Sequence, residues 1–255
     1  MLDSVHRGTA LIADATVGIG ERYACRLAER GYDVILVARQ RAPLYELASR
    51  LTTRTGRNFE VVEADLALPA GLATVEDVLR TDSSITLLVN NVSIDYSTLA
   101  PKIDSFALER LIGLNVTAVA RLTSALVPKL VARQGGTIIQ VTDNVNDQSF
   151  LLDSVYKGIK AFVLAYSQSL RKELVGQGIR IQTVMPASYN AGREIESPAY
   201  SGISTCNCSK ADAFVKAALA GLDRNEFMTT PEMEDADWVI SVDADGFYRF
   251  RRRSS

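Results

Sequence analysis

Short runs of apolar residues alternate along the chain with longer segments whose apolar positions recur at helical spacing. The runs are continuously apolar rather than alternating with polar residues, which indicates strands that are buried on both faces. Such strands belong in a parallel sheet that is covered by helices on each side. The predicted strands are residues 9–13, 33–38, 59–63, 85–89, 137–141, 180–184 and 226–230.

Segments of helical period separate these strands. The predicted helices are residues 20–30, 44–54, 72–79, 105–132, 154–175 and 210–222. Because strands and helices alternate, we predict an α/β fold with a single doubly wound parallel sheet, Rossmann-like, and helices on both faces. No repeat, charge block or low-complexity linker divides the sequence, so residues 1–255 are expected to form one domain.

Two stretches depart from this alternation. Residues 186–209 are rich in Ser, Pro, Gly and Asn, and a connection of this length is typical of a lid or a binding segment. We therefore expect a substrate loop there. In the C-terminal extension, residues 231–255, an Asp-Gly pair between the β-rich runs 238–242 and 247–250 predicts a hairpin.

The composition is that of a globular protein, since 47% of the 255 residues are hydrophobic and 23% are charged. These fractions exclude a disordered or fibrous chain. The formal net charge of −2 provides no general attraction to nucleic acid or to an anionic membrane, so neither is expected as a partner.

Cysteine usage and the N-terminal residues bear on the compartment. Three cysteines are too few for a disulfide framework, and no second ligand pair accompanies Cys206 and Cys208, so no metal site is predicted. The N-terminal residues lack the apolar core of a signal peptide, and no uncharged apolar stretch has the length of a membrane span. We therefore expect a cytoplasmic protein.

A glycine-containing turn follows the first predicted strand and opens the first predicted helix. It comprises residues 13–20, ADATVGIG, in the strand–turn–helix context of a dinucleotide-binding loop. In such a loop, backbone N–H groups and the positive end of the helix approach a pyrophosphate. On this segment alone, an ordinary strand-to-helix turn is an equal alternative. The candidate cofactor-binding residues in it are Asp14, Thr16, Gly18, Ile19 and Gly20.

Tyr156 and Lys160 stand near the start of the helix predicted over residues 154–175. Their i,i+4 spacing places both side chains on one helical face. A cation beside a phenol lowers the pKa of the phenol, and such a tyrosine can pass a proton to a carbonyl oxygen near neutral pH. Taken alone, the pair also fits an ordinary solvated helix face.

Two asparagine motifs complete the set of candidate functional residues. Asn90 and Asn91 end the fourth predicted strand, and Asn115 lies in the helix that follows it. Together with the glycine turn and the Tyr156–Lys160 pair, in this order and on these elements, they make the chain resemble the short-chain dehydrogenase/reductase superfamily. The resemblance implies hydride transfer between a nicotinamide and a small-molecule carbonyl or alcohol substrate.

More narrowly, the chain resembles the NADP-linked branch of that superfamily. The resemblance covers about residues 8–230 and includes Arg39, which follows the second predicted strand in the sequence Val-Ala-Arg. A guanidinium there can pair with the 2′-phosphate of the adenosine, and no acidic residue is present to bind a 2′-hydroxyl. NADP(H) is therefore expected in preference to NAD(H).

The resemblance also assigns roles on the adenosine side of the cofactor. It implies that Asp65 contacts the adenine, with Leu66 beside it. It implies that Asn90 and Asn91 steady the central sheet near the adenosine ribose. Pro186, which follows the sixth strand, matches a further cofactor-binding position.

Catalytic roles follow from the same resemblance. Tyr156 matches the proton donor, and Lys160 matches the lysine that holds the nicotinamide ribose and lowers the pKa of the tyrosine. Asn115 matches the asparagine that positions a water in a proton relay. Asp143 stands at the position of the family's catalytic serine. Since an ionised aspartate accepts hydrogen bonds but donates none, it is a departure from the family pattern.

Alternatives remain at both departures. Asp143 could be protonated, or Thr142 or Ser149 could take its place. Asp14 replaces the first glycine of the family's loop and brings a carboxylate close to the expected phosphates. Two hypotheses therefore stay open: a working NADP(H)-dependent reductase or alcohol dehydrogenase, and a catalytically impaired relative kept for nucleotide or partner binding. In either case the resemblance implies a homodimer or homotetramer that packs through the two long helices.

Overall fold

Seven parallel strands form the central sheet of this computed structural model, which describes residues 6–16, 18–92, 104–142, 154–185, 209–231, 238–242 and 248–252. The strand order is β3-β2-β1-β4-β5-β6-β7, so the winding reverses between β1 and β4. The predicted doubly wound fold is thus confirmed. The strands are β1 (Thr9–Ala13), β2 (Asp33–Ala38), β3 (Phe59–Glu63), β4 (Ile85–Asn90), β5 (Gly136–Val141), β6 (Ile179–Val184) and β7 (Met228–Thr229).

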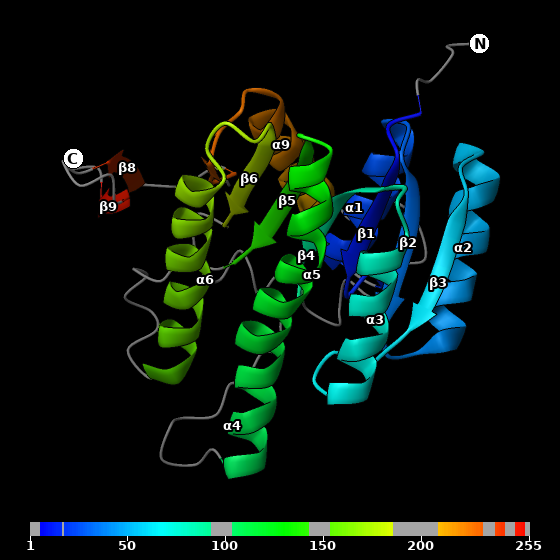
Figure 1. Cartoon of the computed structure of the whole chain (residues 1–255), viewed down its shortest axis with the longest axis horizontal. Coiled ribbons are helices and arrows are strands. Elements are labelled where there is room, and N and C mark those ends of the chain that lie inside the picture. Colours follow the sequence, from blue (N-terminus) through cyan, green and yellow to red (C-terminus); the bar gives the residue numbers. More distant parts are fainter. Residues whose placement is uncertain are drawn as a thin grey trace.

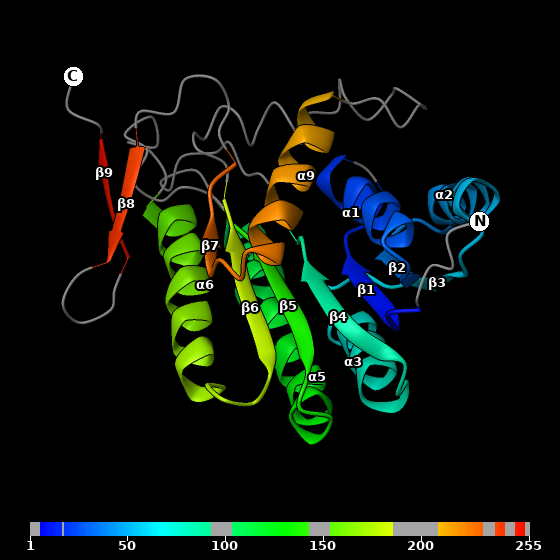
Figure 2. The ribbon, with the colours of Figure 1, turned by 90° about the horizontal axis from the view of Figure 1, so that it is seen from above.

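Helices cover both faces of the sheet (Figures 1 and 2). One face carries α1 (Gly18–Glu29), α2 (Arg41–Thr55) and α9 (Ser209–Asp223). The other face carries α3 (Pro69–Thr81), α5 (Val119–Ala132) and α6 (Ser154–Glu173). Several helices extend beyond their predicted ends. For example, α3 begins at Pro69 rather than at residue 72, because proline suggests a turn in the sequence but is also favoured in the first turn of a helix.

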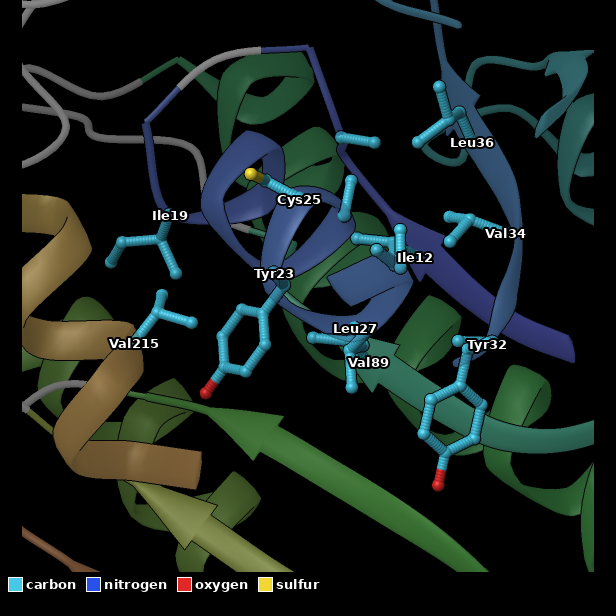
Figure 3. Packing of buried hydrophobic residues seen from close by; sticks show 14 of the residues in the cluster. Ile12, Ile19, Tyr23, Cys25, Leu27, Tyr32, Val34, Leu36, Val89 and Val215 are labelled. Carbon is cyan, nitrogen blue, oxygen red and sulfur yellow. The ribbon is translucent and has the colours of Figure 1, made fainter. Parts of the chain in front are cut away.

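Alternate side chains of each central strand enter opposite cores. In β1, Ala10 and Ile12 face one cluster of buried residues, whereas Leu11 and Ala13 face the other. Figure 3 shows the first cluster, where Tyr23 of α1 lies between the sheet and α9. Burial of each large aliphatic side chain contributes about 1.5–3 kcal/mol, which explains why these strands read as continuous apolar runs.

The helix predicted over residues 105–132 is divided in the structure. It comprises α4 (Ser105–Ile112), a π-helical segment η2 (Gly113–Ala118) and α5. The apolar pattern of this stretch did not indicate the π-turn, which is defined by a local i→i+5 hydrogen-bond pattern rather than by which positions are apolar. By length and composition alone, the stretch Ser105–Ala132 is long and apolar enough to cross a membrane. In the fold, 50% of its most apolar 18-residue segment is buried inside the protein.

The C-terminal hairpin is also present. It pairs β8 (Trp238–Val242) with β9 (Tyr248–Arg252) in an antiparallel sheet of two strands, the second beginning one residue later than predicted. The predicted substrate loop lies outside the described residues except for Ser209, which begins α9.

Candidate functional site

The candidate site lies at the carboxyl ends of the strands, where the sheet changes its winding direction between β1 and β4. In open α/β sheets this is where ligands bind, because the loops diverge and leave a crevice. Asp14 follows β1, Arg39 follows β2, and Asn91 follows β4. The fold therefore brings together residues that are far apart in the sequence.

The turn after β1 has an unusual backbone at Asp14. This residue has a φ of 61°, in the left-handed region that a glycine adopts freely. Aspartate is one of the few L-residues that tolerate this conformation. The Asn91 side-chain amide donates a hydrogen bond from Nδ2 to the Asp14 carbonyl oxygen over 3.2 Å, which holds the turn in place. Asp14 thus holds a backbone conformation that is more readily adopted by glycine.

Gly20 allows α1 to approach this turn closely. A Cβ at Gly20 would lie 2.2 Å from the Asp14 carbonyl oxygen and 3.0 Å from the Ala15 Cα, so no side chain fits there. In dinucleotide-binding loops a glycine at this place permits close helix–strand packing and directs the helix N-terminus at the pyrophosphate. The turn therefore fits a nicotinamide dinucleotide.

The other predicted residues of the turn differ in exposure. Thr16 and Gly18 are partly exposed, and Gly18 has a φ of 58° that glycine accommodates. Ile19 is only 2% exposed and packs in the core beneath α9, so its side chain is directed away from a ligand (Figure 3). Only its backbone N–H is in a position to face a phosphate.

A pocket of about 360 Å³, its open mouth included, opens beside the turn. Four of the predicted cofactor residues line it: Asp14, Arg39, Asp65 and Leu66. Sequence reasoning missed the other residues of its wall. Among them are Arg110 of α4 and Leu114 of the π-helical segment, and no pattern in the sequence indicates that either one reaches this pocket. The remaining lining residues are Ala38, Ala64 and Val92.

Asp65 is held from two sides. Its Oδ1 accepts a hydrogen bond from the Ala67 backbone N–H over 3.0 Å, and its Oδ2 lies 3.4 Å from Arg110 Nη2. The start of α3 also presses against this residue, since a Cβ at Gly71 would lie 2.4 Å from the Asp65 carbonyl oxygen. The carboxylate is therefore fixed at the pocket wall with a cation from α4 as its partner.

Asp14 has a strongly perturbed carboxyl group. Burial raises its pKa to about 6, and the positive charge of Arg39 partly opposes this rise. The carboxyl consequently changes its charge in the range between mildly acidic and neutral pH, next to the arginine predicted to read the 2′-phosphate.

The catalytic candidates meet on the other side of β4. Asn115 lies in the π-helical segment, where its Nδ2 donates to the Leu111 carbonyl oxygen over 3.0 Å. Lys160 of α6 donates from Nζ to the Asn115 Oδ1 over 3.3 Å. Both side chains are buried, at 1% and 3% exposure. The π-turn thus presents the Asn115 carboxamide to the lysine in one fixed orientation.

Several predicted residues cannot be placed as fully. Tyr156 belongs to α6, one turn before Lys160, but its side chain lies outside the described residues, as do Asp143 and Pro186. Thr142, one of the alternatives to Asp143, directly follows β5 and has a buried Oγ1 with no partner among the residues the structure describes.

Asn90 has a structural role distinct from that of Asn91. Its Nδ2 donates to Thr123 Oγ1 over 3.1 Å, and Gln140 Nε2 donates to the same oxygen over 3.1 Å. These bonds join β4 and β5 to α5 in the interior. Asn90 therefore links the central strands to α5, and it is not among the residues that line the pocket.

Comparison with known proteins agrees with this geometry. The family model for short chain dehydrogenase matches residues 8–198. A bulky-bulky ketone specific alcohol dehydrogenase from Comamonas testosteroni superposes with a TM-score of 0.79 and 35% identity, covering 91% of this chain and 89% of that chain. A short-chain dehydrogenase from Sphingobium yanoikuyae in complex with NADPH gives 0.78 and 38%, covering 90% and 89%.

Characterised relatives that match this chain are longer than the matched region. The very-long-chain 3-oxoacyl-CoA reductase of Anas platyrhynchos is 32% identical over 190 residues, which is 69% of this chain and 58% of that protein. The matched region thus spans less than two thirds of this relative.

Proposed function

Because the chain belongs to the short-chain dehydrogenase family of oxidoreductases, we propose that it is an NADPH-dependent carbonyl reductase. The observation that carries the proposal is the buried contact between Lys160 and Asn115, 3.3 Å from Nζ to Oδ1, one helical turn after Tyr156. Burial of an ammonium group is costly unless it has polar partners, and the Asn115 Oδ1 is one of the partners of Lys160.

Each residue of the proposed centre has a separate role. A nicotinamide bound there would supply a hydride for the carbonyl carbon of the substrate. Tyr156 gives its phenolic proton to the carbonyl oxygen, and the positive charge of Lys160 favours that release. Asn115 orients the lysine through Oδ1, while its Nδ2 is held by the Leu111 carbonyl. The two bonds together assign which end of the amide carries oxygen.

NADP(H) in preference to NAD(H) is part of the proposal. Arg39 is exposed at the end of β2 and lines the pocket, where its guanidinium can form paired hydrogen bonds with a phosphate. The bound NADPH of the Sphingobium yanoikuyae relative supports the same cofactor. An ionised Asp14 carboxyl opposes the binding of a 2′-phosphate at Arg39.

The proposed substrates are bulky ketones or the corresponding alcohols. Support comes from relatives whose names describe bulky ketones and very-long-chain 3-oxoacyl groups. We favour an active enzyme over the impaired alternative because Asn115, Lys160, Asn91 and the glycine turn make the contacts such a site needs.

We also propose a homodimer or homotetramer in the cytoplasm. The outer face of α6 exposes the small residues Gly158, Ala161 and Ala165, which allow a second copy to approach closely. Light scattering tests the assembly, since a monomeric mass would contradict it. Cell fractionation tests the compartment, and recovery with membranes would contradict that part.

The activity is tested by following NADPH oxidation against a panel of bulky ketones and 3-oxoacyl thioesters. Steady turnover that falls at least about 100-fold in Tyr156→Phe is expected, because the phenol is the proposed acid. Turnover that is unchanged in Tyr156→Phe would contradict the mechanism. No turnover with any substrate, with cofactor still bound, would favour the impaired relative.

A further inference from the structure

The pocket beside the glycine turn contains an unusual set of charges. Among the described residues that line it, the ionisable ones are Asp14 after β1, Arg39 after β2, Asp65 after β3 and Arg110 of α4. Asp65 and Arg110 form an ion pair with each other at 3.4 Å. The local balance around Arg39 therefore depends on Asp14.

We propose that Asp14 determines cofactor selectivity: its ionised carboxylate competes with a 2′-phosphate for Arg39, so that the preference for NADPH over NADH decreases as the pH rises. The inference rests on the proposed function, since it concerns the same cofactor pocket. It assigns a role to a residue that departs from the family pattern, where the loop has a glycine and no such competition can occur.

The position of the Asp14 side chain is the first reason to expect this competition. Asp14 lines the same pocket as Arg39, and the two groups attract each other strongly enough to affect the carboxyl. A phosphate that pairs with this guanidinium must therefore share a small space with residue 14. A second anion is repelled there when Asp14 is ionised and is accepted when Asp14 is neutral. NADH has a 2′-hydroxyl in place of this phosphate and lacks that part of the repulsion, whereas any repulsion of the pyrophosphate is common to both cofactors and cancels in the ratio of their affinities.

The relevant pH range follows from burial. Because burial raises the pKa of Asp14 to about 6, the carboxyl is largely neutral at pH 5 and largely ionised at pH 8.

The backbone at residue 14 makes clean variants possible. Its φ of 61° is accessible to asparagine and to glycine, so neither replacement strains the turn. Asp14→Asn retains the shape of the side chain and cannot ionise. Asp14→Gly removes the side chain and restores the residue that the family loop has.

The experiment is a calorimetric titration of the full chain and both variants with NADPH and with NADH, at about pH 5 and about pH 8. We expect the ratio of the NADH to the NADPH dissociation constant to fall about ten-fold in the unmodified protein between these pH values, as a charge pair at close range predicts. Both variants are expected to keep a higher ratio at about pH 8. Titration of the 2′-phosphate itself affects all three proteins equally and cancels in the comparison.

Two outcomes separate failure of this inference from failure of the proposed function. If all three proteins bind both cofactors with parallel pH profiles, the role of Asp14 is wrong and the proposed function stands. If none of the three binds either cofactor at either pH, the proposed function is wrong and this inference falls with it.

Discussion

The proposed adenosine pocket and the proposed catalytic centre are built on opposite principles. The pocket places four ionisable side chains around an opening, and Asp14 and Arg39 are among them. The catalytic centre instead buries a single lysine against a carboxamide that a π-turn holds still. The first arrangement responds to pH and ligand charge, whereas the second is fixed by packing. Asp14, which departs from the family pattern, therefore lies in the proposed cofactor pocket, whereas Lys160 and Asn115, which match the family pattern, lie together in the proposed catalytic centre.

Removal of the Lys160 ammonium is expected to have the largest effect. Lys160→Met preserves much of the buried volume and is predicted to lower kcat by about 10²–10⁴-fold, because the tyrosine loses the cation that favours proton release. The dissociation constant of NADPH should change far less than kcat. Steady-state kinetics and direct titration together measure this split. The matched control is Lys172→Met, an exposed position on the same helix. Equal losses of kcat in Lys160→Met and Lys172→Met would contradict the specific role of Lys160 in the proposed catalytic centre.

A methyl group at Gly20 should affect the opposite region. Because a Cβ there would lie 2.2 Å from the Asp14 carbonyl oxygen, Gly20→Ala must push α1 away from the turn. We expect cofactor affinity to fall about ten-fold or more and the unfolding free energy to fall by about 1–3 kcal/mol, as in overpacked cores. Gly135→Ala is the control, since nothing lies within 4 Å of a Cβ at that position. Unchanged cofactor binding in Gly20→Ala would show that the turn does not hold the dinucleotide.

A smaller effect is expected on stability when Asp14 can no longer ionise. Its pKa is raised in the folded protein from 3.8 to about 6, so folding disfavours the ionised form. This cost is absent below about pH 4 and complete above about pH 6. Asp14→Asn should therefore stabilise the protein by about 1–2 kcal/mol at pH 8, a value reduced for partial solvent access, and by nearly nothing at pH 4.

Urea unfolding at the two pH values measures this difference. Asp65→Asn serves as the contrast, because it breaks the ion pair with Arg110 and is expected to destabilise slightly at neutral pH. A constant gain from Asp14→Asn at both pH values would contradict the burial of its carboxyl.

The sequence was sufficient for the sheet and insufficient for several details of the site. Strands such as Asp33–Ala38 were predicted with their correct bounds because burial on both faces makes their residues continuously apolar. The left-handed backbone of Asp14 could not be predicted, since an aspartate also occupies ordinary turns. Arg110 was missed because its place depends on how α4 meets Asp65 in the turn after β3, a tertiary contact that helical period alone does not encode. The π-turn at Asn115 was not predicted either, because the helical period of the apolar residues does not encode it.

Whether Asp14 leaves a working cofactor pocket is measured by nicotinamide fluorescence of the purified full chain, titrated with NADPH at about pH 6. We expect saturable binding with a dissociation constant on the order of micromolar and one site per chain. We also expect weaker binding of NADH under the same conditions. A signal that stays unchanged up to millimolar NADPH would contradict this expectation, because it would mean that the carboxylate at residue 14 has closed the pocket.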